Sequence, residues 1–252
     1  MKLFPKLLNH LVKLYKKTEF TQKVFLTART LRNAGSSRQI EYGWVLRHLQ
    51  GARRILDVGS TNSLLPIQLA SMGYDVYSID PRNYKKYHGL IHPKMKFIQG
   101  DMRFAPFTSG FFDIVTAVST IEHIGTCDYK NPLLEENGDT NTVREIARCL
   151  KQEGKFIFTV PYRTKITISM KRKWAETLRR RGAIINSVKS QQSPLRAYNE
   201  ETIRKRLLTD RFYVEKEKYF YKQGDFWYPA STNEIKKLDV EERLACIIAK
   251  KN

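Results

Sequence analysis

The sequence predicts an α/β protein of the doubly wound, Rossmann-like class, in which helices cover both faces of a mostly parallel sheet. Short apolar runs of strand length recur over residues 55–161, and several of them end in an acid. Helical patterns separate these runs, most clearly over residues 142–150. Alternating strands and helices of this kind favour a parallel sheet covered on both faces.

The first predicted strand covers residues 55–58 and leads into a turn of small residues. Residues 65–72 then place apolar side chains at helical spacing. A strand that enters a helix through a tight turn directs backbone N–H groups towards whatever lies above the sheet. Asp57 stands at the end of this strand, where open α/β sheets bind their ligands.

Four further strands are predicted in the same region, at residues 75–80, 96–101, 112–118 and 155–161. The first two of these end in Asp80 and Asp101. Asp80 follows Asp57 by 23 positions, about the spacing at which an acid reaches a ribose diol. The strand at residues 112–118 leads into a segment that contains Glu122 and His123.

Residues 53–162 resemble the core of class I S-adenosylmethionine (SAM) dependent methyltransferases, especially the small-molecule, type 11-like branch. The resemblance lies in the Asp-x-Gly that ends the first strand and in the Glu-His after the fourth. It implies a seven-stranded sheet whose last strand, at residues 244–249, is antiparallel. It also implies SAM as the cofactor, bound by Asp57, Gly59, Ser60, Asp80, Pro81, Asp101, Met102 and Ser119.

Within this implied set, the turn at Gly59 approaches the methionine part of SAM. Asp80 holds the ribose hydroxyls, while Asp101 and Met102 flank the adenine. The family usually has three glycines at alternate positions in the turn, whereas this chain has Gly59, Thr61 and Ser63. A β-branched residue disfavours positive φ, so either the turn is built differently here or its backbone stands further from the ligand.

The segment after the fourth strand holds the candidate catalytic residues, because the resemblance places it beside the methyl group and the acceptor. Methyl transfer from a sulfonium is an in-line displacement, in which positioning supplies much of the rate. His123 is the candidate general base for a hydroxyl acceptor, and Glu122 would orient it or a substrate group. The alternatives are a histidine that only packs or caps, and an acid favoured by a helix dipole.

Acidic residues are frequent just beyond this segment, at Asp128, Glu135, Glu136 and Asp139. Hard oxygen ligands of this kind bind Mg²⁺ or Ca²⁺. The composition of residues 136–139 favours a solvated turn instead, and we predict no metal site.

Length and composition fit one large soluble domain, because 252 residues allow a substantial core and no apolar run is long enough to span a bilayer. The three cysteines show neither a disulfide framework nor a zinc spacing, which predicts a cytoplasmic protein.

The net charge of +20 lies almost entirely outside the predicted core. We predict a basic helical extension over residues 1–51, and a methyltransferase domain over residues 52–252 that includes a basic insertion or lid at 163–197. Such flanks attract an anionic acceptor, a membrane surface or nucleic acid, although solubility alone is an equal alternative.

Two flanking segments each allow more than one interpretation. Residues 1–17 have the pattern of a basic amphipathic helix. Such a helix either packs on the domain or lies on the surface of an anionic membrane. In the family that the chain resembles, segments at the position of residues 163–197 often cover the acceptor site. A solvated basic face and an RNA-binding surface are the alternatives.

The remaining elements are a helix that begins near residues 36–37 and stops at Gly51, a helix capped by Asn199, and a half-exposed strand at residues 212–221. Residues 226–229 are an aromatic cluster, whose rings either pack within the protein or form a wall on which a sugar stacks.

The predicted function is SAM-dependent methyl transfer to a small or carrier-linked acceptor. Residues 119–125 and 136–139, together with the insertion, resemble methyltransferases of surface-glycan assembly, which favours O-methylation of a sugar. The alternatives are an RNA methyltransferase, favoured by the basic flanks, and a non-catalytic scaffold, favoured by Thr61 and Ser63 in the turn.

Overall fold

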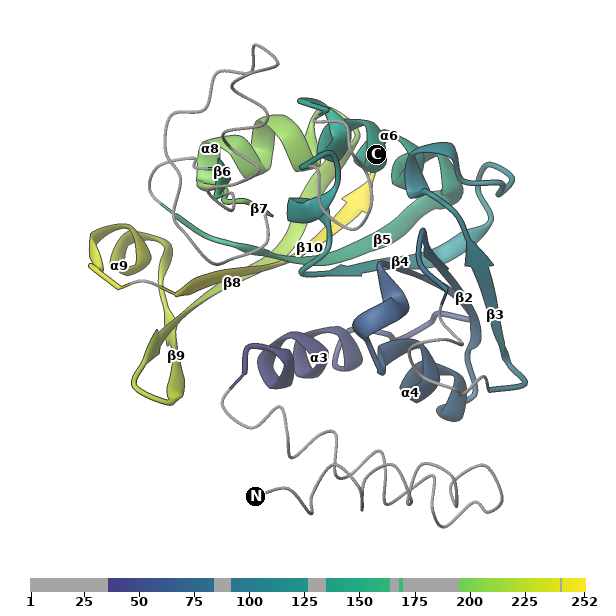
Figure 1. Cartoon of the computed structure of the whole chain (residues 1–252), viewed down its shortest axis with the longest axis horizontal. Helices are drawn as coiled ribbons and strands as arrows, with labels where there is room; N and C mark the ends of the chain where they lie inside the picture. Colours follow the sequence, from purple (N-terminus) through teal and green to yellow (C-terminus); the bar gives the residue numbers. More distant parts are fainter. Residues whose placement is uncertain (1–35, 84–91, 127–134, 164–167, 170–194, 241) are drawn as a thin grey trace. The chain divides into compact units, whose positions relative to one another are not determined.

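The computed structural model describes residues 36–83, 92–126, 135–163, 168–169, 195–240 and 242–252 (Figure 1). It divides into two compact units, Met1–Ile40 and Glu41–Asn252. The predicted helix at residues 1–17, Asp128 and most of the basic insertion at 163–197 lie outside the described residues.

The second unit is built on an eight-stranded sheet with the order β3-β2-β1-β4-β5-β10-β8-β9. Its parallel part consists of β1 (Arg54–Val58), β2 (Asp75–Asp80), β3 (Met95–Gln99), β4 (Phe112–Val118) and β5 (Leu150–Pro161). Its antiparallel part consists of β10 (Arg243–Lys251), β8 (Phe212–Gln223) and β9 (Phe226–Ala230). The predicted fold class is confirmed, as is the antiparallel last strand.

The sheet has one strand more than the seven predicted, because the aromatic cluster at residues 226–229 forms the edge strand β9. Gly224, with φ of 60°, lies in the two-residue loop that joins β8 to β9, and such loops favour glycine. The rings of Tyr221 and Tyr228 stack across this hairpin at 5.6 Å. Pro229 is tolerated because β9 is an edge strand.

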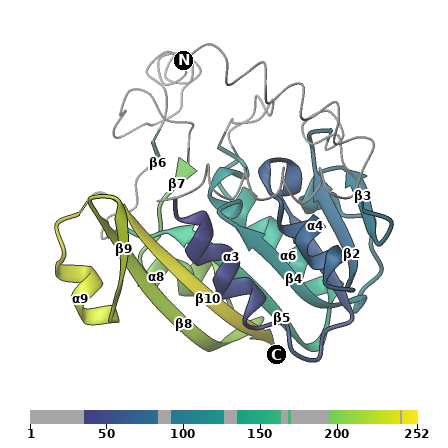
Figure 2. The ribbon, with the colours of Figure 1, turned by 90° about the horizontal axis from the view of Figure 1, so that it is seen from below.

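Helices cover both faces of the sheet (Figures 1 and 2). One face carries α3 (Arg38–Leu46) and α4 (Leu65–Ser71), and the other carries α6 (Gly138–Cys149) and α8 (Glu200–Thr202). The other described elements are β6 (Ile168–Ser169), β7 (Leu195–Arg196), α9 (Thr232–Lys237) and the helical turns η1 (Ser60–Asn62), η2 (Met102–Phe104), η3 (Ile121–His123) and η4 (Ile203–Leu208).

The core beneath α6 is apolar because β4 and β5 are covered on both sides. Val115, Phe156 and Phe158 are fully buried there and belong to one cluster with Val143 and Ile146 of α6. Parallel strands buried in this way read as continuous apolar runs, which is why the sequence predicts them well. Within the ranges given above, no helix is both long and apolar enough to cross a membrane.

The predicted solvated turn at residues 136–139 is wrong for its second half, because α6 begins at Gly138 and Asp139 is fully buried. The Asp139 carboxylate accepts hydrogen bonds from the Tyr198 hydroxyl (3.0 Å) and from Nη2 of Arg206 (2.6 Å). Burial raises the pKa of Asp139, but the Arg206 hydrogen bonds and nearby arginine charges bring it below its usual value. These partners lie far along the sequence, so local composition did not reveal them.

The predicted cap at Asn199 is confirmed. Its side chain accepts from the backbone N–H of Thr202, and the Thr202 hydroxyl bonds the Asn199 backbone N–H in return, forming a capping box.

Candidate active site

The carboxyl ends of β1, β2 and β4 meet at one edge of the sheet. Asp57 of β1 lies opposite Ser78 of β2 and Thr116 of β4. Just beyond the strands, the Gly59 N–H donates to the Ile79 carbonyl oxygen at 2.9 Å. The sequence-predicted residues that follow these strands are therefore brought together along this edge.

The turn after β1 needs glycine at one position only. Gly59 adopts φ of 80° and ψ of 40°, and a Cβ added there would lie 2.3 Å from Cγ2 of Thr120. Ser60–Asn62 continue as the 3₁₀ turn η1. In the part of the chain that the structure describes, positive φ outside glycine occurs at Ser119, Glu153 and Thr209. Thr61 therefore fits without strain, and the turn is built differently from a three-glycine turn.

The small side chains of this turn point into the protein. Thr61 is fully buried, and its backbone N–H donates to Oδ2 of Asp80 at 2.9 Å. The hydroxyls of Ser60 and Ser78 lie 2.7 Å apart. Asp57 is 2% exposed and accepts a 2.7 Å hydrogen bond from the Thr116 hydroxyl. These contacts fix the turn against β2 and β4.

The acid at the end of β2 is covered by an arginine two residues later. Asp80 is 2% exposed, and Arg82 folds back on it. The Arg82 backbone N–H and Nε donate to Oδ1 at 2.8 and 3.1 Å, while Nη2 donates to Oδ2 at 3.1 Å. Both carboxylate oxygens of Asp80 thus accept hydrogen bonds from a fork of donors. In this conformation the fork is supplied by Arg82.

The acid after β3 has the same arrangement. Arg103 donates its backbone N–H to Oδ1 of Asp101 at 2.9 Å and its guanidinium to both carboxylate oxygens. Burial raises the pKa of Asp101, but the Arg103 hydrogen bonds and charge outweigh it and leave the pKa lowered. Pro81 beside Asp80 is exposed, whereas Met102 is buried in the core. The repeated Asp-x-Arg spacing is a sequence signal that could have predicted both forks.

A buried network that the sequence did not predict lies at the ends of β4 and β5. Glu41 of α3 is fully buried, and its Oε1 accepts hydrogen bonds from the hydroxyls of Ser119 and, at 2.7 Å, Thr159. Ser119 has φ of 44°, a conformation that costs energy outside glycine. Its backbone N–H donates to the Thr159 carbonyl at 3.1 Å. Glu41 therefore ties α3 to the ends of both strands.

The candidate catalytic pair lies on η3, directly after β4 and Ser119. Glu122 is 1% exposed, whereas His123 is half-buried. Successive residues on a 3₁₀ turn point about 120° apart, so the two side chains leave the backbone in different directions. Burial, and then the charges of nearby acids, Asp139 before Glu122, raise the pKa of Tyr198.

Arg196 of β7 fixes the segment after η3. It is 4% exposed, and its guanidinium donates to the carbonyl oxygens of Ile124, Glu135 (2.6 Å) and Glu136 (3.3 Å). These carbonyls lie on either side of residues 127–134. One buried cation therefore joins the two described segments that flank residues 127–134.

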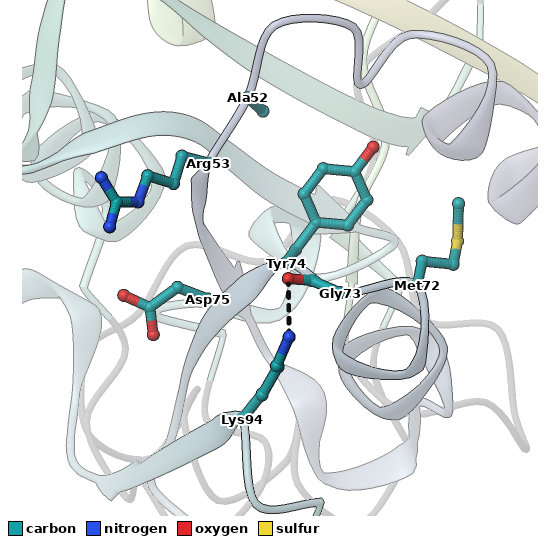
Figure 3. Close-up of a pocket in the computed structure, with 7 residues that line it drawn as sticks. All are labelled: Ala52, Arg53, Met72, Gly73, Tyr74, Asp75 and Lys94. Atoms are coloured by element: carbon teal, nitrogen blue, oxygen red, sulfur yellow. Dashed lines mark hydrogen bonds between the residues drawn. The ribbon is translucent and has the colours of Figure 1, made fainter.

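A separate hollow of about 590 Å³ lies at the opposite, amino-terminal edge of the sheet (Figure 3). Arg53, Asp75 and Lys94 are among its lining residues, and Lys94 Nζ donates to the Gly73 carbonyl oxygen at 3.4 Å. None of the predicted site residues lines it.

Comparison with protein-family models matches residues 56–158 to a family described as "Methyltransferase domain". The matched range runs from within β1 to within β5 and includes the turn at Gly59, both Asp-x-Arg forks and η3. No curated protein matches the chain.

Solved structures share the fold at low sequence identity. A protein from Pyrococcus horikoshii OT3 is 17% identical with a TM-score of 0.54, over 86% of this chain and 90% of that one. The 1,6-didemethyltoxoflavin-N1-methyltransferase of Burkholderia thailandensis, solved with 1,6-didemethyltoxoflavin and S-adenosylhomocysteine, is 11% identical with a TM-score of 0.53 (96% and 90%). The N-methyltransferase NodS of Bradyrhizobium japonicum WM9, solved with S-adenosylhomocysteine, is 13% identical with a TM-score of 0.51 (88% and 97%).

Proposed function

We infer that this chain, a class I SAM-dependent methyltransferase, methylates a hydroxyl of a small or carrier-linked saccharide. The observation that carries the proposal is the shared carboxyl edge of β1, β2 and β4, where Gly59 and Asp80 lie together within the matched family range. SAM suits this edge chemically, because a ribose diol donates hydrogen bonds and the Asp80 carboxylate accepts them, as it accepts from Thr61 and Arg82 in this conformation.

The proposed contacts divide the cofactor among three elements. Asp80 accepts from the ribose hydroxyls, with Pro81 beside it. Asp101 and Met102 hold the adenine, and the turn with Gly59 and Ser60 approaches the methionine part. Asp57 and Ser119 support this end from β1 and β4. When bound, SAM supplies an electrophilic methyl group on a sulfonium.

The residues of η3 are proposed to act on the acceptor. His123 takes the proton of the acceptor hydroxyl as that oxygen forms its bond to the methyl group and the carbon–sulfur bond breaks. Glu122 is proposed to orient this region from its buried position. A half-buried imidazole has a ring nitrogen that can accept the proton of an acceptor hydroxyl.

The saccharide acceptor is supported by the sequence resemblance to glycan-assembly methyltransferases and by the excess of basic residues outside residues 52–162. A cytoplasmic location is part of the proposal, since Cys149 and Cys246 are buried as free thiols.

Calorimetry with SAM and with S-adenosylhomocysteine tests the first part of the proposal. We expect saturable binding of both at one site per chain. Absence of heat with either compound would refute the cofactor assignment and favour the scaffold alternative.

His123→Ala is expected to lower kcat by about 10²-fold or more, because positioned acid–base groups contribute about 10²–10⁴-fold. SAM affinity should stay the same. The assay follows S-adenosylhomocysteine formation with a panel of saccharides and sugar phosphates. In the wild type, kcat should fall as the pH is lowered and the imidazole is protonated, and this limb should vanish in the variant.

His92→Ala is the matched control, because His92 precedes β3 at the opposite edge of the sheet and contacts the Lys94 backbone N–H. Normal turnover by His123→Ala across this pH range would remove His123 as the base.

A further inference from the structure

Strand β8 carries different chemistry on its two faces beside the proposed acceptor site. Successive residues of a strand point to opposite faces. Glu217 and Tyr219 share the face of the α6 core, where Tyr219 is buried and Glu217 pairs with Arg204 at 3.4 Å. The opposite face, here called the lysine face, consists of Lys216, Lys218, Phe220 and Lys222 of β8, with Trp227 of β9 paired to Lys222.

Two charges of the lysine face lack a carboxylate partner among the described residues. Lys222 pairs with Glu242 at 3.0 Å. Lys216 and Lys218 are exposed and lie instead beside aromatic rings, with Nζ 5.9 Å from the Trp44 ring and 5.5 Å from the Phe220 ring. Glu217, which lies between these two lysines in the sequence, points to the other face and pairs with Arg204. The lysine face is therefore positive and partly aromatic.

The register of the sheet places this face level with the candidate active site. Lys218 pairs with Cys246, and Cys246 pairs with Thr159, whose carbonyl oxygen accepts from the Ser119 N–H. Three strand steps separate β4 from β8. Neighbouring strands lie about 4.8 Å apart, so Lys218 is about 14 Å across the sheet from the end of β4.

The aromatic residues of the face lie at the same edge. Phe220 pairs with Leu244, which pairs with Pro161 at the carboxyl end of β5. The hairpin of β8 and β9 continues past this level to Gln223 (Figure 2). An acceptor that enters over the carboxyl edge therefore meets the lysine face on its β8 side.

We propose that the lysine face binds the phosphate group of the acceptor, which is a phosphorylated saccharide. Lysine ammonium groups bind phosphate as point charges, and the flat faces of aromatic rings contact sugar rings. The spacing across the sheet puts about 14 Å between the Lys218 backbone and the end of β4, and the lysine side chain and the acceptor together cover this distance. This inference rests on the proposed function and names its substrate class.

The test measures binding of glucose 1-phosphate and inorganic phosphate to the full chain by calorimetry. The double variant Lys216→Gln/Lys218→Gln should bind glucose 1-phosphate at least fivefold more weakly than the wild type. Phe220→Leu should remove the preference for glucose 1-phosphate over inorganic phosphate, while inorganic phosphate binding persists.

The matched control is Lys94→Gln/Lys96→Gln, which removes the same charge from two exposed lysines at the same spacing, at the start of β3. It should bind glucose 1-phosphate like the wild type. Equal losses in both double variants, or no loss in either, would overturn the proposal. Both should bind SAM normally, so a failure of the cofactor assignment is seen separately.

A third arm uses a labelled single-stranded oligouridine at several salt concentrations. Tight binding that falls steeply with salt and is lost in Lys216→Gln/Lys218→Gln, without any effect on glucose 1-phosphate, would overturn the saccharide assignment in favour of nucleic acid.

Discussion

Asp80→Ala is expected to weaken SAM binding by more than tenfold. The carboxylate is 2% exposed and already accepts from Thr61 and Arg82, so its oxygens are held in place at the edge. Hydrogen bonds to charged groups are worth about 1.5–3 kcal/mol each, and the loss of one such bond to a ribose hydroxyl accounts for tenfold. Calorimetry with SAM measures the change directly.

Arg82 makes this prediction sharper, because its guanidinium uses the same two oxygens that the ribose is proposed to use. Arg82→Met removes the competing donors while leaving the aliphatic part of the side chain. We expect it to bind SAM several-fold more tightly than the wild type. Weaker SAM binding by Asp80→Ala together with tighter SAM binding by Arg82→Met would distinguish a direct ribose contact from a general loosening of the turn.

Asp75→Ala serves as the control for Asp80→Ala. Asp75 begins the same strand at the other edge of the sheet, where it pairs with Arg54 at 3.3 Å near the surface. Its loss should leave SAM affinity unchanged. Unchanged affinity in Asp80→Ala itself would defeat the ribose assignment.

The elements that the sequence predicted are those whose signal is local. Strands β2 and β4 coincide with their predicted bounds. β4 is a mostly apolar, buried run, and β2 is a short segment with Val76 and Ile79 that ends in an acid. The role of Gly59 is also local, since Gly59 directly follows β1 and adopts a left-handed conformation that favours glycine. A cap such as Asn199 depends on residues within one turn.

The features that the sequence did not reveal depend on contacts between distant residues. Glu41 reads locally as an acid near a helix start, but its partners Ser119 and Thr159 are 78 and 118 positions away. Asp139 reads as part of a solvated turn, yet Arg206 lies 67 positions on. A buried polar side chain is identified by its partner, and the fold alone brings the partners together.

Glu41→Ala is expected to destabilise the protein by about 1–3 kcal/mol, the cost of leaving buried polar groups without a partner. The substitution removes the acceptor of two hydroxyls, at Ser119 and Thr159, in a region with no solvent access at Glu41. It also releases the strained backbone of Ser119, which precedes η3 with its His123. Urea denaturation measures the first effect, and kcat for methyl transfer should fall with it.

Glu41→Gln distinguishes loss of the side-chain volume from loss of the hydrogen-bond acceptor, because glutamine has the same length as glutamate and keeps one carbonyl oxygen. We expect it to keep more stability than Glu41→Ala. Glu145→Ala is the control, since Glu145 pairs with Arg148 on α6 near the surface, where ion pairs contribute about 0–1 kcal/mol.

The strongest test combines Glu41→Ala with Ser119→Ala and Thr159→Val. Replacing a buried donor and its acceptor together by apolar groups is nearly neutral, whereas replacing one alone leaves the other unsatisfied. The triple variant should therefore be more stable than Glu41→Ala alone, with coupling of about 0.5–3 kcal/mol. Strict additivity would show that the three side chains do not form one energetic unit. In that case the φ of Ser119 must be held by its backbone bond to Thr159, and Glu41 contributes to α3 alone.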